Sequence, residues 1–170
     1  MTNAGKARYK GVELEVNAVP VRGLTAYATF GYVDRKFKKF EILNTNANSL
    51  GYPVGQIVDI ADIAQFSYSA STTLNTGVQY EFPAFDFGKL AVRLDYNYRS
   101  KVYLSPNPLA SPFNEQIASP ARGLLDARVT LSEIAVGPGK ASVSVWGKNI
   151  TDKKYGAAGI DFGSMGFGGN

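Results

Sequence analysis

The run 34–40, DRKFKKF, holds the densest group of side chains in this chain that could bind a charged ligand. Its cations are Arg35, Lys36, Lys38 and Lys39, with phenylalanines interleaved. Guanidinium and ammonium groups bind phosphates and carboxylates through charge-assisted hydrogen bonds. We therefore take these residues as candidates for capture of an anionic ligand or of lipopolysaccharide phosphates. A solvated basic loop explains the same run, and single-stranded nucleic acid, which stacks on aromatic rings, is the least favoured partner.

Oxygen-bearing side chains gather in the stretch that follows. Asp59 and Asp62 come shortly after Asn44, Asn46 and Asn48, and calcium prefers oxygen ligands. Their spacing does not match the DxDxDG pattern of a dedicated calcium loop. We therefore interpret them as polar residues of a loop, and we predict no metal site and no cofactor.

The absence of two residue types limits the chemistry further. The chain of 170 residues contains no histidine and no cysteine. This excludes zinc sites built on those residues, thiol catalysis, disulfides and any Ser-His-Asp triad. Because the commonest acid–base catalyst is missing, we expect no enzyme. The formal net charge of +4 is compatible with anionic partners but requires none.

Alternation of apolar and polar residues predicts the elements that position these side chains. In 88–103, Val92 and Leu94 fall on one side of a period-two ladder, and Arg93 and Asp95 fall on the other. Consecutive side chains of a strand point to opposite faces, so this run is a strand with one apolar face. The same test predicts an all-β chain of about six strands, longer than the usual five or six residues. The expected strands are 9–18, 23–32, 67–82 with a break near Gly77, 88–103, 123–131 and 140–149.

The connections between these expected strands alternate between short and long. Turns marked by proline and glycine are expected at 19–23, 83–88 and 132–139, and long connections at 33–66 and 104–122. In an up-and-down antiparallel sheet this alternation places every turn at one end and every long loop at the other. Outer-membrane barrels have this arrangement, with short periplasmic turns and longer extracellular loops.

In three of the expected strands, 9–18, 88–103 and 123–131, charged residues gather on one parity. They are Glu13, Glu15, Arg93, Asp95, Asp126 and Arg128. A cation on the lipid face at the bilayer midplane costs about 2–4 kcal/mol, so we expect the apolar parity to meet lipid and the charged parity to line a lumen. The predicted fold is an antiparallel up-and-down transmembrane β-barrel segment. A soluble β-sandwich binding module and an oligomeric outer-membrane pore are the alternatives.

Four stretches of the chain carry a family resemblance. They are GKARYKGVELEV (5–16), GLTAYATFGYVD (23–34), LAVRLDYNYRSKVYLSP (90–106) and VSVWGKNITDKKYG (143–156). In this order they resemble the late barrel strands of TonB-dependent outer-membrane receptors. The last stretch is the most specific, because it is similar to the Trp-Gly-Lys-Asn-Leu-Thr-Asp…Tyr signature near the C-terminus of that family.

This resemblance implies a fold, a location and partners. Receptors of this family are large barrels with an N-terminal plug that import siderophores, cobalamin, carbohydrates or other scarce nutrients with energy transmitted by TonB. Residues 1–170 are then expected to be the C-terminal portion of the barrel domain, without the plug and without the final strand. The implied partners are outer-membrane lipid and lipopolysaccharide, the remainder of barrel and plug, TonB, and a small-molecule ligand that the resemblance does not identify. The implied location is the outer membrane of a Gram-negative cell.

Overall fold

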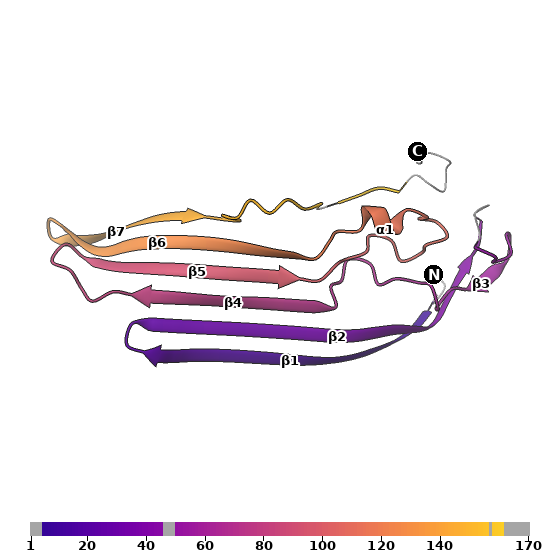
Figure 1. Cartoon of the computed structure of the whole chain (residues 1–170), viewed down its shortest axis with the longest axis horizontal. Coiled ribbons are helices and arrows are strands. Elements are labelled where there is room, and N and C mark those ends of the chain that lie inside the picture. Colours follow the sequence, from indigo (N-terminus) through magenta and orange to yellow (C-terminus); the bar gives the residue numbers. More distant parts are fainter. Residues whose placement is uncertain (1–4, 46–49, 157, 162–170) are drawn as a thin grey trace.

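Long antiparallel strands dominate the computed structural model, which describes residues 5–45, 50–156 and 158–161. The strands are β1 (Gly5–Val21), β2 (Leu24–Leu43), β3 (Ile57–Asp59), β4 (Thr72–Glu81), β5 (Lys89–Arg99), β6 (Arg122–Val136) and β7 (Gly139–Gly147), and the single-turn helix α1 is Asn114–Ile117 (Figure 1). Within the described ranges, no helix has the length and apolar character needed to cross a membrane. The prediction of an all-β chain is confirmed.

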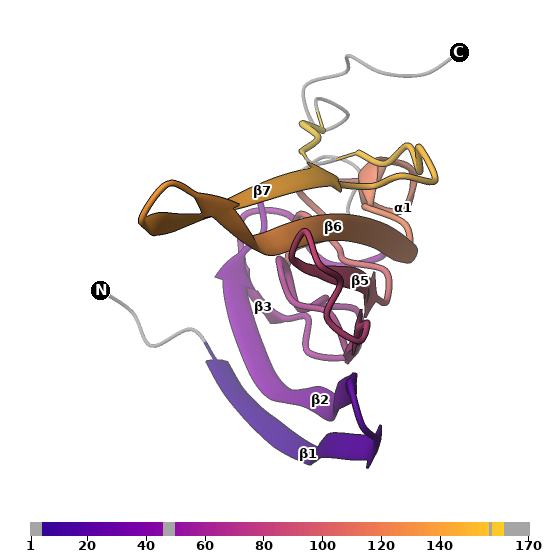
Figure 2. The same cartoon turned by 90° about the vertical axis from the view of Figure 1, so that its left-hand side faces the viewer.

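Six strands form one sheet in the order β1-β2-β4-β5-β6-β7, and β3 pairs with the far end of β2. Each strand is antiparallel to its neighbours, which is the predicted up-and-down arrangement. Seen along the strands, the sheet curves as an arc from β1 to β7 (Figure 2). In the described part of the chain β1 and β7 do not pair with each other, so the arc is an open section of wall with two free edges.

The largest difference from the predicted strands lies in β2. We expected this strand to end at residue 32, but it continues to Leu43. Its extension is paired on both sides, because β1 reaches Gly5 opposite Phe40 and β3 ends with Asp59 opposite Glu41. The first long connection is therefore shorter than predicted, and it contains a strand of its own.

Other strand boundaries shift less. β4 begins at Thr72 instead of 67, and β5 ends at Arg99 instead of 103. Both ends are fixed by Ser100, whose Oγ accepts the backbone N–H groups of Ser71 at 3.0 Å and of Thr72 at 3.1 Å. β6 continues to Val136, into the predicted turn.

Short and long connections lie at opposite ends of the sheet, as predicted. The turns 22–23, 82–88 and 137–138 are at one end, and the connections 44–71 and 100–121 are at the end that carries β3 and α1 (Figure 1). The turn between β1 and β2 needs only two residues because Gly23 adopts a left-handed backbone with φ of 83°, which favours glycine.

The pairing register gives the sheet one apolar face. Leu14 lies opposite Phe30, and Val92 lies opposite Val129. No other element of the described chain covers this face, since even on the central strands Leu94 is 40% and Val129 45% exposed. The large apolar residues of the face include Val12, Leu14, Val16, Phe30, Tyr32, Val78, Leu90, Val92, Leu94, Val129, Leu131, Val143 and Val145.

The opposite face carries the predicted charges of β1, β5 and β6. On this charged face Arg93 lies opposite Arg128, and Asp95 lies opposite Asp126. The favourable contacts therefore run along a strand: the Arg93 guanidinium binds the Asp95 carboxylate, with Nη2–Oδ1 and Nε–Oδ2 distances of 2.8 Å each.

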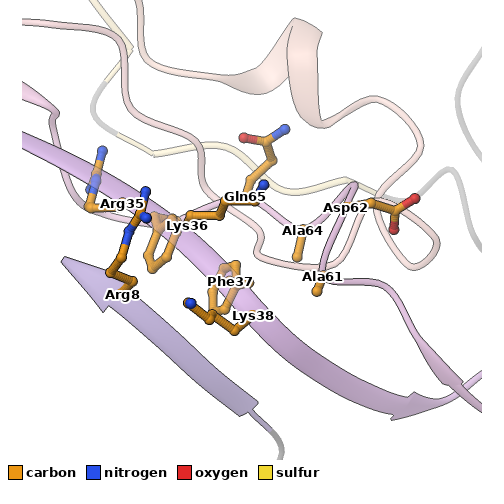
Figure 3. A pocket seen from close by; sticks show the side chains of 10 residues that line it. Arg8, Arg35, Lys36, Phe37, Lys38, Ala61, Asp62, Ala64 and Gln65 are labelled. Carbon is orange, nitrogen blue, oxygen red and sulfur yellow. The ribbon is translucent and has the colours of Figure 1, made fainter.

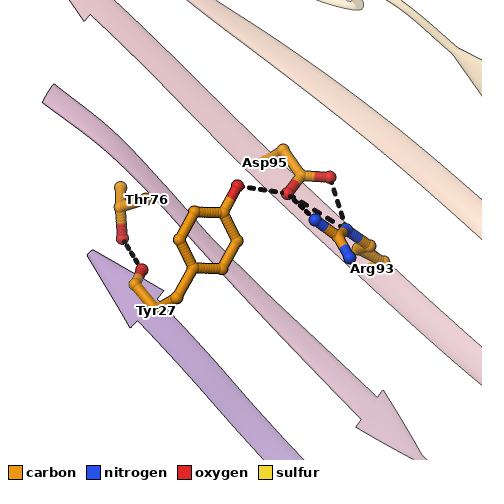
Figure 4. Close-up of polar contacts among 4 residues, drawn as sticks. All are labelled: Tyr27, Thr76, Arg93 and Asp95. Atoms are coloured by element: carbon orange, nitrogen blue, oxygen red, sulfur yellow. Dashed lines mark hydrogen bonds and ion pairs between the residues drawn. The ribbon is translucent and has the colours of Figure 1, made fainter. Parts of the chain in front are cut away.

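The Tyr27 ring lies across β4 and points to this ion pair (Figure 4), and the β4 residue beneath the ring is Gly77. Tyr27, Gly77 and Asp95 occupy one row of the sheet, and the Tyr27 hydroxyl donates to Asp95 Oδ1 at 2.8 Å. A Cβ at Gly77 would lie 2.9 Å from Tyr27 Cζ and 2.5 Å from Asp95 Oδ1. The strand break expected near Gly77 is therefore wrong, because the strand continues and the glycine makes room for the ring.

Gly77→Ala is expected to destabilise the folded sheet by about 1–3 kcal/mol, the usual cost of overpacking, because the added methyl group displaces the Tyr27 ring. Thermal unfolding in detergent, followed by circular dichroism, measures the loss. Gly156→Ala is the matched control, since a Cβ there meets no atom within 4 Å. Equal transition midpoints for the two variants would contradict the role assigned to Gly77.

Candidate functional site

The two long connections pack against each other at one end of the sheet. The backbone N–H of Gln65 donates to the carbonyl of Pro106 at 3.1 Å, and that of Tyr68 donates to Tyr103 at 2.9 Å. A small apolar core also joins the connections, made of Val58, Ile60 and Leu109. The long loops thus form one packed layer with its own core.

Phe66 holds this loop layer against the charged-face side of β2. Its ring stacks on Phe37 with a centroid distance of 4.0 Å and meets Tyr9 of β1 edge-on at 5.5 Å. The Arg35 guanidinium lies 5.3 Å from the centroid of the same ring and donates to the Ser69 carbonyl at 2.9 Å. Arg35 therefore fastens the loop as well as carrying charge.

A cavity of about 780 Å³ opens beside Phe66 and Arg35 (Figure 3). Aromatic rings and cations line it together, and Gln65, Ala64 and Asp62 close it from the loop side. Its charged lining residues are Arg8, Arg35, Lys36, Lys38 and Asp62. Four cations against one carboxylate give the cavity an excess of positive charge, which favours an anionic ligand.

The four predicted basic residues lie in strand β2, so the prediction that they belong to a loop is wrong. Strand alternation also separates them. Arg35 is half-buried on the charged-face side, whereas Lys36 is exposed on the other side. Lys38 lies at a register shift of the β1–β2 ladder, and Lys39 forms an ion pair with Glu41 at 2.9 Å. The run therefore divides between two faces.

Arg8 lines the cavity but was not among the predicted residues. This residue lies directly opposite Lys36 in the β1–β2 ladder, and its Nη2 is 3.3 Å from Asp34 Oδ2. Alternation in β1 was the available signal, because it places Arg8 and Lys10 on the same side as Val12. Only the register, which follows from folding, brings Arg8 beside Lys36.

Asp59 serves the local fold. Its Oδ1 accepts the backbone N–H groups of Phe40 at 2.9 Å and of Ala61 at 3.0 Å. These hydrogen bonds hold the pKa of Asp59 below its ordinary value because they stabilise the charged form. The carboxylate therefore fixes the chain where β2 and β3 meet.

The remaining polar residues of this loop are also engaged with their neighbours. The Tyr52 hydroxyl donates to Asp62 Oδ1 at 2.8 Å, and Asn44 Nδ2 donates to the Tyr52 carbonyl at 3.2 Å. Asn46 and Asn48 lie outside the described residues. In the described ranges there is no group of three or more acidic side chains that could hold a metal ion.

Comparison with known proteins agrees with this geometry. A family model described as TonB dependent receptor-like, beta-barrel, matches residues 1–150. The curated proteins and the solved structures give no significant match. The matched region includes every strand of the sheet together with both long loops. The chain therefore belongs to the TonB-dependent receptor β-barrel family, whose members are receptors and transporters of the outer membrane.

Proposed function

We propose that this chain forms part of the barrel wall of a receptor for TonB-dependent uptake of a scarce nutrient, such as a siderophore, cobalamin or a carbohydrate. The observation that carries the proposal is the curved sheet with one exposed apolar face and one charged face. In an outer-membrane barrel the first face meets lipid and the second lines an aqueous lumen. A soluble β-sandwich would cover its apolar face with a second sheet, and no described residue of this chain does so.

The free edges support a place inside a larger barrel. Unpaired backbone groups in hydrocarbon cost several kcal/mol each, so β1 and β7 need neighbouring strands. We assign residues 1–170 to the C-terminal portion of the barrel domain, because 143–156 resembles the family signature near the C-terminus. The remainder of the barrel then pairs with both edges, and the plug, through which TonB acts, faces the charged side. Several copies of this chain would also pair the edges as a pore, but the family match favours the receptor.

The cavity beside Phe66 supports an anionic nutrient. Arg35, on the side of Phe66, and Lys38 supply its positive charge, and Phe37 and Phe66 supply stacking surface. Arg8 and Lys36 also line it, but they lie on the outward parity of their strands. Siderophores that carry carboxylate or catecholate groups combine negative charge with planar rings, so they fit this lining better than a neutral sugar does.

The outward side of β1 and β2, near the loop end of the sheet, supports contact with lipopolysaccharide. Arg8, Lys10 and Lys36 continue the parity of Val12 and therefore extend the apolar face beyond its last large apolar residues. A band of cations directly above a lipid-facing surface is placed to bind the phosphates of an anionic outer leaflet. Asp34, paired with Arg8, is the carboxylate on this band.

Residue labelling tests the orientation of the wall. In whole cells Val54→Cys, in the connection 44–71, should react with an impermeant maleimide, whereas Ala84→Cys, in the turn 82–88, should not, because long loops of such barrels face the outside. The chain contains no cysteine that would add background. Equally strong labelling of both variants would overturn the orientation.

Substitution with arginine tests the two faces. Leu94→Arg should reduce the amount of folded receptor in the outer membrane, because a cation on the lipid face costs about 2–4 kcal/mol. Ala91→Arg is the matched control, since Ala91 lies on the charged face between Glu81 and Thr130. Heat-modifiable migration of the receptor in gels measures the folded fraction. Equal folded fractions for both variants would refute the lumen-and-lipid assignment.

Charge removal on the outward band tests the lipid contact. Lys10→Gln and Lys36→Gln should each lower the affinity for lipopolysaccharide by about fivefold, since one cation near an anionic surface contributes about 1 kcal/mol. Titration of the purified receptor with lipopolysaccharide measures the affinity. Lys140→Gln, at the opposite end of the sheet, is the control, and an equal loss there would show that net charge alone is responsible.

A further inference from the structure

Arg99 and Arg122 stand directly opposite each other on the charged face, at the loop ends of β5 and β6. Like charges placed opposite one another across two strands destabilise a sheet. Within the described ranges, neither arginine forms an ion pair with a carboxylate. The nearest acidic residues on this face of their own strands are Asp95 and Asp126, each four residues or about 13 Å away. Among the described residues, the pair therefore has no carboxylate that compensates its two positive charges.

A second arginine pair on the same two strands has the carboxylate partner that the Arg99–Arg122 pair lacks among the described residues. Arg93 and Arg128 also lie directly opposite each other, six residues further along. There the Asp95 carboxylate accepts two short hydrogen bonds from Arg93, each of 2.8 Å. At the Arg99–Arg122 pair no such acceptor is present among the described residues, and Arg99 Nε and Arg122 Nη1 are buried without a hydrogen-bond partner.

Both guanidinium groups are nevertheless held in place from the loop side. Arg99 Nη2 donates to Ser119 Oγ at 2.6 Å, and the Ser119 hydroxyl, itself buried, donates to the Gly156 carbonyl at 2.8 Å. The Tyr155 ring centroid lies 3.6 Å from Arg122 Cζ. Because these groups are already oriented, they lose little conformational freedom when an acceptor binds.

We propose that Arg99 and Arg122 together bind one oxyanion, the carboxylate or phosphate group of a small solute that reaches the charged face from the loop end of the sheet. Such a group presents two oxygens to the two guanidinium forks and cancels the repulsion between them. The site is distinct from the cavity beside Phe66, with which it shares no lining residue. It requires only the described fold, so it holds whether or not the proposed transport is correct.

Calorimetric titration of the purified, detergent-solubilised receptor with citrate and with inorganic phosphate, at constant ionic strength, tests the site. The unmodified receptor should bind at least one of these probes saturably. Arg99→Gln and Arg122→Gln should each weaken that binding tenfold or more, whereas Arg128→Gln should change it less than twofold. Because no transport is measured, a negative result here leaves the proposed function untouched.

Three results would overturn the proposal: no saturable binding of either probe to the unmodified receptor, unchanged binding in both glutamine variants, or an equal loss in Arg128→Gln. Folding is checked by circular dichroism. If the glutamine variants do not fold, Arg99→Lys and Arg122→Lys decide instead, because lysine keeps the charge and loses the two-pronged donor geometry. They should bind more weakly than the unmodified receptor, and binding of equal strength would contradict a site built on paired guanidinium groups.

Discussion

The pairing register is the constraint on which the rest of this structure depends. A slip of one residue in any strand would carry its charges to the apolar face. The row formed by Tyr27, Gly77 and Asp95 resists such a slip across three strands, because the Tyr27 hydroxyl reaches Asp95 only when glycine lies between them. On the opposite face the Thr76 hydroxyl donates to the Tyr27 carbonyl at 2.8 Å. A polar side chain on the apolar face is thereby satisfied by the backbone of the same row.

The pairing register also decides which charges meet on the charged face. Since the register sets like charges opposite one another on β5 and β6, compensation has to come from residues along a strand or from the aromatic groups beside it. Arg93 uses Asp95 in this way, and Arg128 lies 5.6 Å from the ring centroid of Trp146. Near its middle the face has a carboxylate partner for Arg93, whereas at Arg99 and Arg122 the described residues provide the Tyr155 ring but no carboxylate. A carboxylate beside Arg99 and Arg122 would stabilise the sheet. Its absence among the described residues therefore points to a role in binding.

Sequence alone predicts the centres of the strands and fails where alternation is lost. The runs around Leu94 and Val129 alternate strictly, so both their strand character and their faces follow from the residue types. In 34–40 basic and aromatic residues alternate without an apolar face, and the register shift near Lys38 interrupts the period, so the extension of β2 could not be predicted. The role of Gly77 was misread because its reason, the Tyr27 ring, comes from another strand. Arg8 was missed for the same reason, since only cross-strand pairing brings it to Lys36.

Stability of the loop layer comes from a source different from that of the wall. The wall is held by backbone ladders and needs lipid and neighbouring strands to cover its apolar face. The loops instead bury Ile60 and Leu109 against each other, so each long loop completes the core of the other. Phe66 and Arg35 then fix that layer to β2 beside the positively charged cavity. Because the cavity is lined from both the strand and the loop, residues in the loop can vary and change the lining of the cavity while the register of the wall is preserved.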